Sequence, residues 1–191
     1  MKNLLYAMIL LFALSGCSTF NPFIEQKKPV IKKDEFSDSI EILGVSALKK
    51  DGADMSSALK MSLNPQNPKN KSIISINYFI KSLVNSKNDS ISHYIYLEHV
   101  NLGKNRLKIN RASLKSGSDL DVEEVESDVL SCQLTGICTF YEAVNIHTPT
   151  NLLFNNIDSG ISVKVYSTRH SFVINLSPEQ ISEQFKAIEN L

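Results

Sequence analysis

The chain of 191 residues has no tryptophan, only seven glycines and three cysteines, and its 20 basic residues are balanced by 20 acidic ones. A balanced charge supplies no field that would gather nucleic acid, and no local basic patch replaces it. Three cysteines exclude a disulfide-dense miniprotein, and a hydrophobic share of 42% excludes a disordered chain. We therefore expect a single globular domain that has no nucleic-acid partner.

Catalytic motifs are scarce as well. The sequence has no Gly-x-Ser-x-Gly elbow, no glycine-rich phosphate loop and no His-Glu-x-x-His pair. It offers no nucleophile next to a base and no cluster of metal-ligating residues in sequence. We therefore predict a non-enzymatic protein without cofactor or metal. A hydrolase with a dispersed site is the less favoured alternative, because catalytic triads assemble from residues that are distant in sequence.

The amino terminus is the most informative segment. Lys2 supplies one positive charge, and the uncharged run 4–14 follows it. As a helix these eleven residues would span roughly 16 Å, about half of a hydrocarbon core near 30 Å. The pattern is typical of a signal peptide rather than of a transmembrane helix.

Directly after this run stand Leu14, Ser15, Gly16 and Cys17. This order resembles the lipobox of bacterial lipoproteins, in which a leucine and two small residues precede the cysteine. The resemblance implies cleavage between Gly16 and Cys17, a diacylglyceryl thioether on Cys17 and acylation, for example with palmitate, of the new amino terminus. Two or more acyl chains anchor a protein firmly to a membrane without spanning it.

The residue after the cysteine is Ser18, not the aspartate that usually retains Gram-negative lipoproteins at the inner membrane. By the same resemblance, we expect a lipid-anchored protein of the bacterial outer membrane whose domain faces the periplasm.

Three segments follow from this signature: a cleaved signal peptide at 1–16, a lipidated flexible tether at 17–36 and one folded domain at 37–191. The tether contains Pro22, Pro29 and four lysines, and no sustained apolar period. Contact of these lysines with anionic lipid is one interpretation. A solvated linker is favoured because acidic residues follow closely.

From residue 37 onward apolar and polar residues alternate with period two, which is the spacing of strands. Eight strand candidates result, at 40–45, 74–81, 93–100, 107–114, 125–132, 138–147, 161–166 and 172–176. The last two meet in a hairpin turn at 167–170. Short strands without helices between them predict a mainly β fold, an antiparallel β-sandwich of about seven or eight strands.

Two segments have helical signals. The weaker, at 54–62, follows Asp54 as a candidate cap and ends before Pro65. The stronger begins with Ser177 as N-cap and Pro178 as the first helical residue, with Gln180 completing a capping box. We predict that its apolar stripe, formed by Ile181, Phe185 and Ile188, closes over an open edge or face of the sheet.

Cys132 and Cys138 enclose five residues between two strand candidates. A disulfide is expected because an exported protein meets oxidising conditions, and the short loop would contribute roughly 2.4 kcal/mol in the chain-entropy model. The alternatives, a redox pair or half of a metal site, lack the usual two-residue spacing.

Glu142 is a candidate buried acid, since it shares a strand face with Phe140 and Val144. Burial of an unpartnered carboxylate would be costly. It is therefore either a tuned acid or binding anchor, or a structural residue. The structural alternatives are a bulge that turns it outward and a pair with Arg111, Lys164, Arg169 or His147.

Three further patterns have a favoured structural interpretation. His93 and His99 share a strand face about 20 Å apart, too far to bind one metal ion. Tyr94 and Tyr96 on the other face suit packing better than a binding strip. Six carboxylates in residues 119–128 suit a solvated acidic loop better than a calcium site.

Together these features predict an envelope lipoprotein, held in the membrane by acyl chains on Cys17, that serves as a structural or accessory subunit docking on another envelope component. The alternative is a module that binds a small or lipidic ligand, and a pocket lined from both sheets would favour it.

Overall fold

The computed structural model describes residues 25–33, 37–50, 73–134, 136–168 and 170–191. The signal peptide, the lipobox and the helix predicted at 54–62 lie outside these residues.

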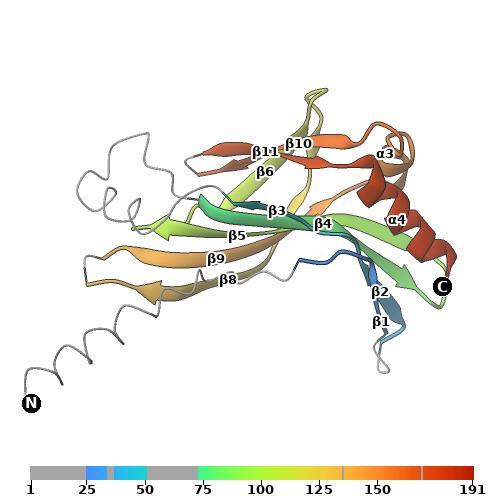
Figure 1. Cartoon of the computed structure of the whole chain (residues 1–191), viewed down its shortest axis with the longest axis horizontal. Helices are drawn as coiled ribbons and strands as arrows, with labels where there is room; N and C mark the ends of the chain where they lie inside the picture. Colours follow the sequence, from blue (N-terminus) through green and yellow to red (C-terminus); the bar gives the residue numbers. More distant parts are fainter. Residues whose placement is uncertain (1–24, 34–36, 51–72, 135, 169) are drawn as a thin grey trace, which may run out of the picture.

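Two antiparallel sheets form the domain (Figure 1). The larger has the order β1-β2-β4-β5-β9-β8, and β3 also pairs with β4. Its strands are β1 (Val30–Lys33), β2 (Ser39–Leu43), β3 (Ala47–Lys50), β4 (Ile73–Asn85), β5 (Ile91–Gly103), β8 (Val122–Cys132) and β9 (Cys138–His147). The smaller has the order β11-β10-β6-β7, formed by β6 (Ile109–Leu114), β7 (Asp119–Leu120), β10 (Ile161–Ser167) and β11 (Ser171–Leu176).

The predicted antiparallel β-sandwich with a carboxyl-terminal helix is confirmed, and each of the eight strand candidates forms a strand. Three short strands, β1, β3 and β7, were not predicted. β1 lies in the segment that we assigned to the tether, so the folded domain begins before residue 37. Its Ile31 pairs with Ile42 of β2, and this pairing holds the segment in the sheet.

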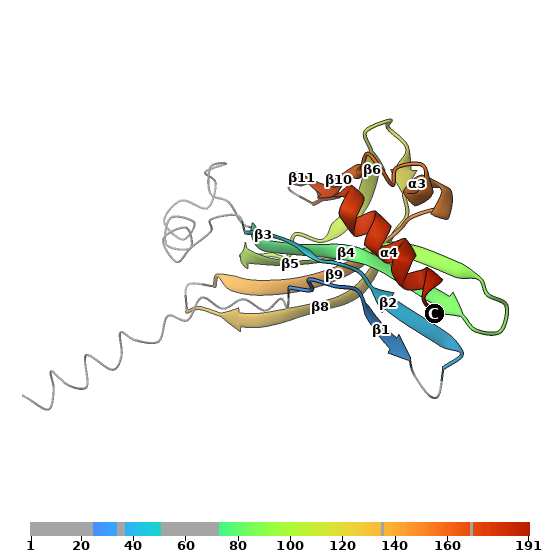
Figure 2. The same ribbon diagram turned by 45° about the vertical axis from the view of Figure 1, so that its right-hand side comes forward.

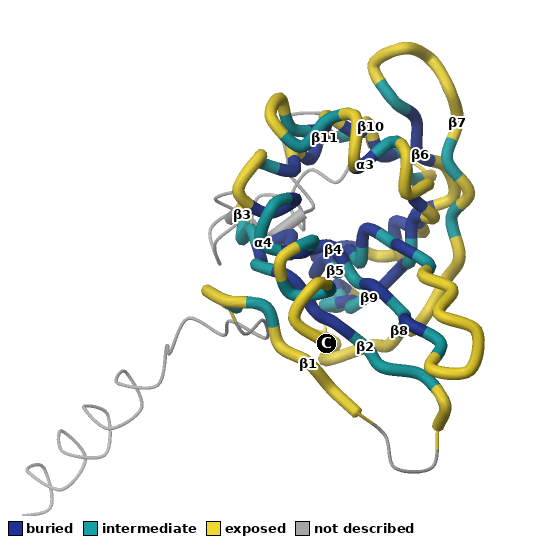
Figure 3. Tube along the Cα trace, turned by 90° about the vertical axis from the view of Figure 1, so that its right-hand side faces the viewer, coloured by how far each residue is buried: buried dark blue, intermediate teal, exposed yellow. Residues whose placement is uncertain are grey.

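The core lies between the facing sides of the two sheets. Alternate residues of the long strands point inward, as period two requires. Buried side chains of the larger sheet, such as Ile80, Ile95 and Val144, pack with Val163 and Ile174 of the smaller one. Figure 3 shows the two layers end on, with the buried residues of β4, β5 and β9 in the middle of the lower layer and the exposed β1 at its margin.

Helix α4 (Pro178–Glu189) covers the part of the inner face formed by β2 and β4, while α3 (Thr150–Phe154) lies nearby (Figure 2). The capping box of Ser177 and Gln180 forms as predicted. Ile181 is fully buried, and Gln184 donates to Ser82 Oγ at 2.7 Å and to the carbonyl of Ile42 at 3.1 Å. No helix in the described ranges is long and apolar enough to span a membrane.

Gly44 lies directly beneath α4, and its replacement tests this contact. A Cβ atom there would lie 2.5 Å from Gln184 Oε1 and 2.8 Å from the carbonyl oxygen of Ile80. We expect Gly44→Ala to lower the free energy of unfolding by about 1–3 kcal/mol, the usual cost of overpacking. Urea unfolding measures this. A smaller loss is expected in a Gln184→Ala background, and an unchanged midpoint in the wild-type background would contradict the close approach.

Candidate functional site

The β8–β9 hairpin contains the disulfide predicted between Cys132 and Cys138. The two residues face each other across the strand pair, with their Cα atoms 4.0 Å apart. Beyond the disulfide, the amide of Gly136 donates to the carbonyl of Gln133, and the amide of Gln133 donates to the carbonyl of Ile137. Gly136 has φ +75°, which favours glycine over other residues. A covalent bond and a tight turn therefore fix this loop.

Glu142 is buried, as the sequence indicated, and it does not turn outward. Its Oε1 accepts from the amide of Ile109 at 2.8 Å, and its Oε2 lies 3.3 Å from His99 Nε2. Arg111, Lys164 and His147 are not involved, and Arg169, the fourth partner suggested by the sequence, lies outside the described residues. The reason is the strand order, because β5 and β9 are neighbours and His99 stands directly opposite Glu142.

The environment of Glu142 tunes its pKa in two opposing ways. Burial by itself would raise the pKa of the carboxyl group. The contact with His99 and the amide of Ile109 more than offset burial, so that the pKa lies below its ordinary value. Since Ile109 begins β6, this carboxylate links the larger sheet to the smaller one. The arrangement fits a structural role.

His93 lies on the same strand face as His99 but has its own partners. It is only 2% exposed, and its Nδ1 lies 2.8 Å from Ser82 Oγ. Its ring meets the ring of Phe185 at 6.0 Å, so it lies under α4. Burial, with a smaller contribution from His147, lowers the pKa of His93. Among the described residues, no three His, Cys, Asp or Glu side chains are grouped so that they could hold a metal ion.

These two lowered pKa values predict a stability that declines with acid. Between the folded and unfolded pKa of His93 the unfolded chain binds more protons, so the free energy of unfolding falls as the pH drops below about 6.5, by at most about 1.4 kcal/mol per pH unit for one group. Protonation of Glu142 adds a further loss below about pH 4.5. Urea unfolding at neutral and mildly acidic pH measures the first step. His93→Asn, which preserves a partner for Ser82, should flatten it.

The acidic run at 119–128 does not form the loop that we predicted. It lies in β7 and β8, with all six carboxylate residues exposed. β8 is the last strand in the described order of the larger sheet, and its charged side chains are exposed. Charge along an edge strand limits pairing with other strands.

The outer face of the larger sheet, turned away from the core, contains a groove of about 340 Å³. Its lining comes from β1, β2, β4, β5 and β8, together with Gln26. Lys32 belongs to one margin of the sheet and Val125 to the other. Because residues from both margins line one groove, the sheet curves around its outer face.

Aromatic rings form the floor of this groove, and charges surround them. Phe79 and Tyr96 lie with their ring centroids 5.0 Å apart, and Lys81 Nζ is 5.6 Å from the centre of the Tyr96 ring. Lys81 also pairs with Glu41 at 2.8 Å, and Glu41 in turn lies 4.0 Å from Lys32. Tyr96 therefore packs on a neighbouring ring and also faces the groove. Packing and binding, the two interpretations of this residue, are thus compatible.

Glu98 is a member of this site that the sequence analysis missed. Its Oε1 accepts from Asn77 Nδ2 at 2.7 Å, and its Oε2 accepts from the hydroxyl of Tyr141 at 2.9 Å. Burial, and then the charge of Glu98, raise the pKa of the Tyr141 hydroxyl. The three residues come from β4, β5 and β9. The available signal was their shared position on the polar side of each strand, but the pairing of the strands was needed to group them.

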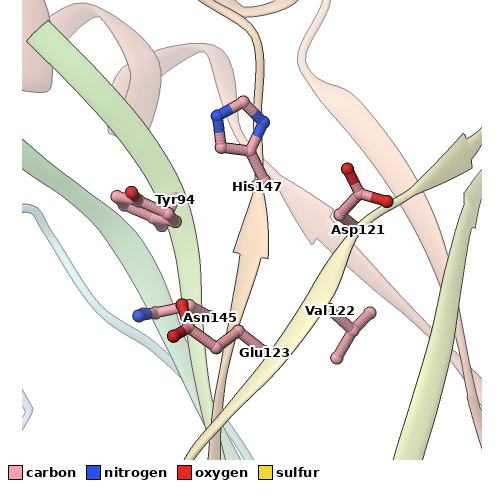
Figure 4. A pocket seen from close by; sticks show the side chains of 6 residues that line it. All are labelled: Tyr94, Asp121, Val122, Glu123, Asn145 and His147. Carbon is pink, nitrogen blue, oxygen red and sulfur yellow. The ribbon is translucent and has the colours of Figure 1, made fainter.

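A second groove of about 300 Å³ lies further along the same face, where β9 ends (Figure 4). Tyr94, Asn145 and His147 line it together with residues 121–123. The rings of Tyr94 and His147 meet edge to face at 5.6 Å. In Figure 4 the carboxylates of Asp121 and Glu123 do not converge on His147. Neither groove takes a residue from the smaller sheet.

Comparison of the chain with known protein families, with curated proteins and with solved structures finds no match.

Proposed function

We propose that this protein is a lipid-anchored, non-enzymatic accessory subunit of the bacterial envelope, and that its outer-face groove receives a segment of another envelope protein. The lipobox resemblance at Cys17 supports the anchor and the outer membrane as its place. The Cys132–Cys138 disulfide agrees with an oxidising compartment such as the periplasm. The observation that carries the docking function is the groove lined by five strands of one curved sheet.

The chemistry of the groove suits a protein segment. Aromatic residues are enriched where proteins bind one another, and a polar rim usually surrounds them. Here Phe79 and Tyr96 form the apolar floor, while Lys81, Glu41 and Glu98 supply charges of both signs around it. A partner segment with an apolar anchor between polar residues would match this arrangement.

Site-specific photocrosslinking in intact cells tests the docking function. A photoreactive phenylalanine derivative at Tyr96 should capture one protein in high yield, because this ring lines the groove. The matched control is the same derivative at Val173, which is 44% exposed on β11 of the other sheet. Mass spectrometry of the purified adduct identifies the partner.

A defined adduct at Tyr96 that is absent at Val173 would support the proposal. No adduct at Tyr96, or the same adducts at both positions, would contradict docking through this groove. The second candidate function, binding of a small or lipidic ligand, is favoured only by the size of the groove, which lies at the lower end of the range for ligand pockets. If docking is contradicted, extraction of small molecules and lipids from the purified protein tests this second function.

The anchor has its own test. Cys17→Ser removes the thiol that the lipobox resemblance assigns to the thioether. We expect the variant to remain as an unacylated precursor of larger mass, whereas the wild-type protein should be shortened and should carry acyl chains. Metabolic labelling with a fatty acid and intact mass measure both effects. A variant of normal mature size would contradict the lipoprotein assignment.

A further inference from the structure

The closed end of the β8–β9 hairpin is apolar and exposed. No charged residue occurs in the sequence from Val129 to Tyr141. Leu134 at the turn is fully exposed, and Val129 and Leu130 on the approaching strand are 41% and 39% exposed. An exposed leucine is ordinary when it stands alone. Several exposed apolar residues in an uncharged stretch mark a surface that meets a partner or a membrane.

The hairpin presents this surface in a fixed conformation. The disulfide joins the two strands at the base of the turn, and the amides of Gln133 and Gly136 close it. A fixed loop loses little conformational entropy when it inserts into another phase. The shape of the hairpin therefore favours contact through Leu134.

The described chain begins near the middle of the sheet, on the hairpin side of β1 (Figure 1). Gln26 is hydrogen-bonded to Ser46, which directly precedes β3. Residue pairing across β4 and β5 places the start of β3 level with Val144 of β9, so Gln26 lies at about that level. From Val144 to Cys138 the strand covers about 20 Å. The nine residues from Gln26 back to Cys17 reach up to about 30 Å, enough to bring Cys17 level with the turn.

One exposed cation stands beside the disulfide. Gly103 is paired with Cys138, so the connection after β5 begins there with Lys104. The exposed Arg106 and Lys108 follow on the same connection and lie further from the turn, near Ser127 and Glu142. An apolar tip with a cation beside it suits an anionic lipid surface.

We propose that the tip of the β8–β9 hairpin, centred on Leu134, inserts into the surface of the bilayer in which Cys17 is anchored. This inference rests on the proposed lipid anchor. It adds a second membrane contact, which fixes the orientation of the domain and keeps the end with α3 and α4 away from the bilayer. Figure 1 shows the hairpin and α4 at opposite ends of the molecule.

The absence of tryptophan from the chain permits a direct test. In Leu134→Trp the only indole stands at the turn, and the position is exposed, so folding should not be disturbed. The acylated mature variant is bound to vesicles of phosphatidylcholine and phosphatidylglycerol, with the phosphatidylcholine brominated in its acyl chains. We expect the indole emission to shift to shorter wavelength and to lose intensity relative to vesicles without bromine.

The matched control is Phe154→Trp, at a position 65% exposed in α3 at the opposite end of the sheet. Its emission should be the same on both kinds of vesicle. If the indole of Leu134→Trp emits as in water while the protein is vesicle-bound, or if both variants are quenched alike, the proposed insertion of the tip is wrong. The proposed lipid anchor is not contradicted by either result. If the protein does not bind vesicles at all, the anchor is wrong and the inference fails with it.

Discussion

Glu142→Ala should lower the free energy of unfolding by about 2–4 kcal/mol, because it removes a buried carboxylate and leaves the buried groups that face it without their partner. The amide of Ile109 would lose its acceptor, and His99, which is 1% exposed, would lose the carboxylate opposite it. Since domains are stabilised by only about 5–15 kcal/mol, this is a large fraction of the total. Urea unfolding followed by circular dichroism measures the effect.

Two further variants separate the pair from simple loss of volume. Glu142→Gln preserves an acceptor for Ile109 and should cost less than alanine. Replacing Glu142 and His99 together by leucine should recover part of the loss, because apolar residues of similar size often substitute for a buried pair. Glu126→Ala is the control, since this carboxylate is exposed on β8 and should change stability by no more than about 0.5 kcal/mol. Equal changes in the free energy of unfolding for Glu126→Ala and Glu142→Ala would show that the contact between Glu142 and His99 does not stabilise the domain.

The strands of this fold could be predicted to the extent that their residues show alternation. Seven of the eight recognised strands have one face that meets the core, whereas β8 has no buried residue. β1, β3 and β7 have four, four and two residues. Segments this short show too little of the pattern, and pairing with a longer neighbour defines them instead. The order of the strands depends on contacts between distant segments, and no local pattern contains it.

The same limit applies to the candidate sites. Local sequence was enough for the disulfide, since Cys132 and Cys138 are joined by a single turn. It was also enough to predict that Glu142 is buried, but not to identify His99 as its partner, because that pairing depends on the adjacency of β5 and β9. The outer-face groove needs five strands in the correct order, so it could not be predicted. Its aromatic floor was visible only as Tyr96 on one strand.

Helix α4 shows how local and distant information combine. Its capping box could be predicted from Ser177 and Gln180 alone. The polar contact beneath it could not, because Gln184 binds to Ser82 and to the carbonyl of Ile42, which are about a hundred or more residues away in sequence. The apolar stripe predicted that the helix packs, and the structure adds the buried glutamine that fixes its position.

Removal of residues 181–191 should therefore destabilise the whole domain. Loss of the fully buried Ile181 alone is expected to cost about 2–5 kcal/mol, and loss of Gln184 leaves Ser82 and the carbonyl of Ile42 with fewer partners. His93 would also lose the ring of Phe185 that covers it. For a domain of this size the sum lowers Tm by on the order of 10 °C or more, which thermal unfolding by circular dichroism measures.

Removal of only Glu189–Leu191 is the matched control, because these three residues are exposed and lie beyond the buried turns of the helix. This shorter truncation should leave Tm nearly unchanged. Ile181→Ala in the full-length chain should account for about half of the effect of the long truncation, with the remainder due to Gln184 and Phe185. An unchanged Tm after the long truncation would mean that the inner face of β2 and β4 is stable without a cover. The burial of Ile42 and Ser82 argues against that result, since α4 packs on both β2 and β4.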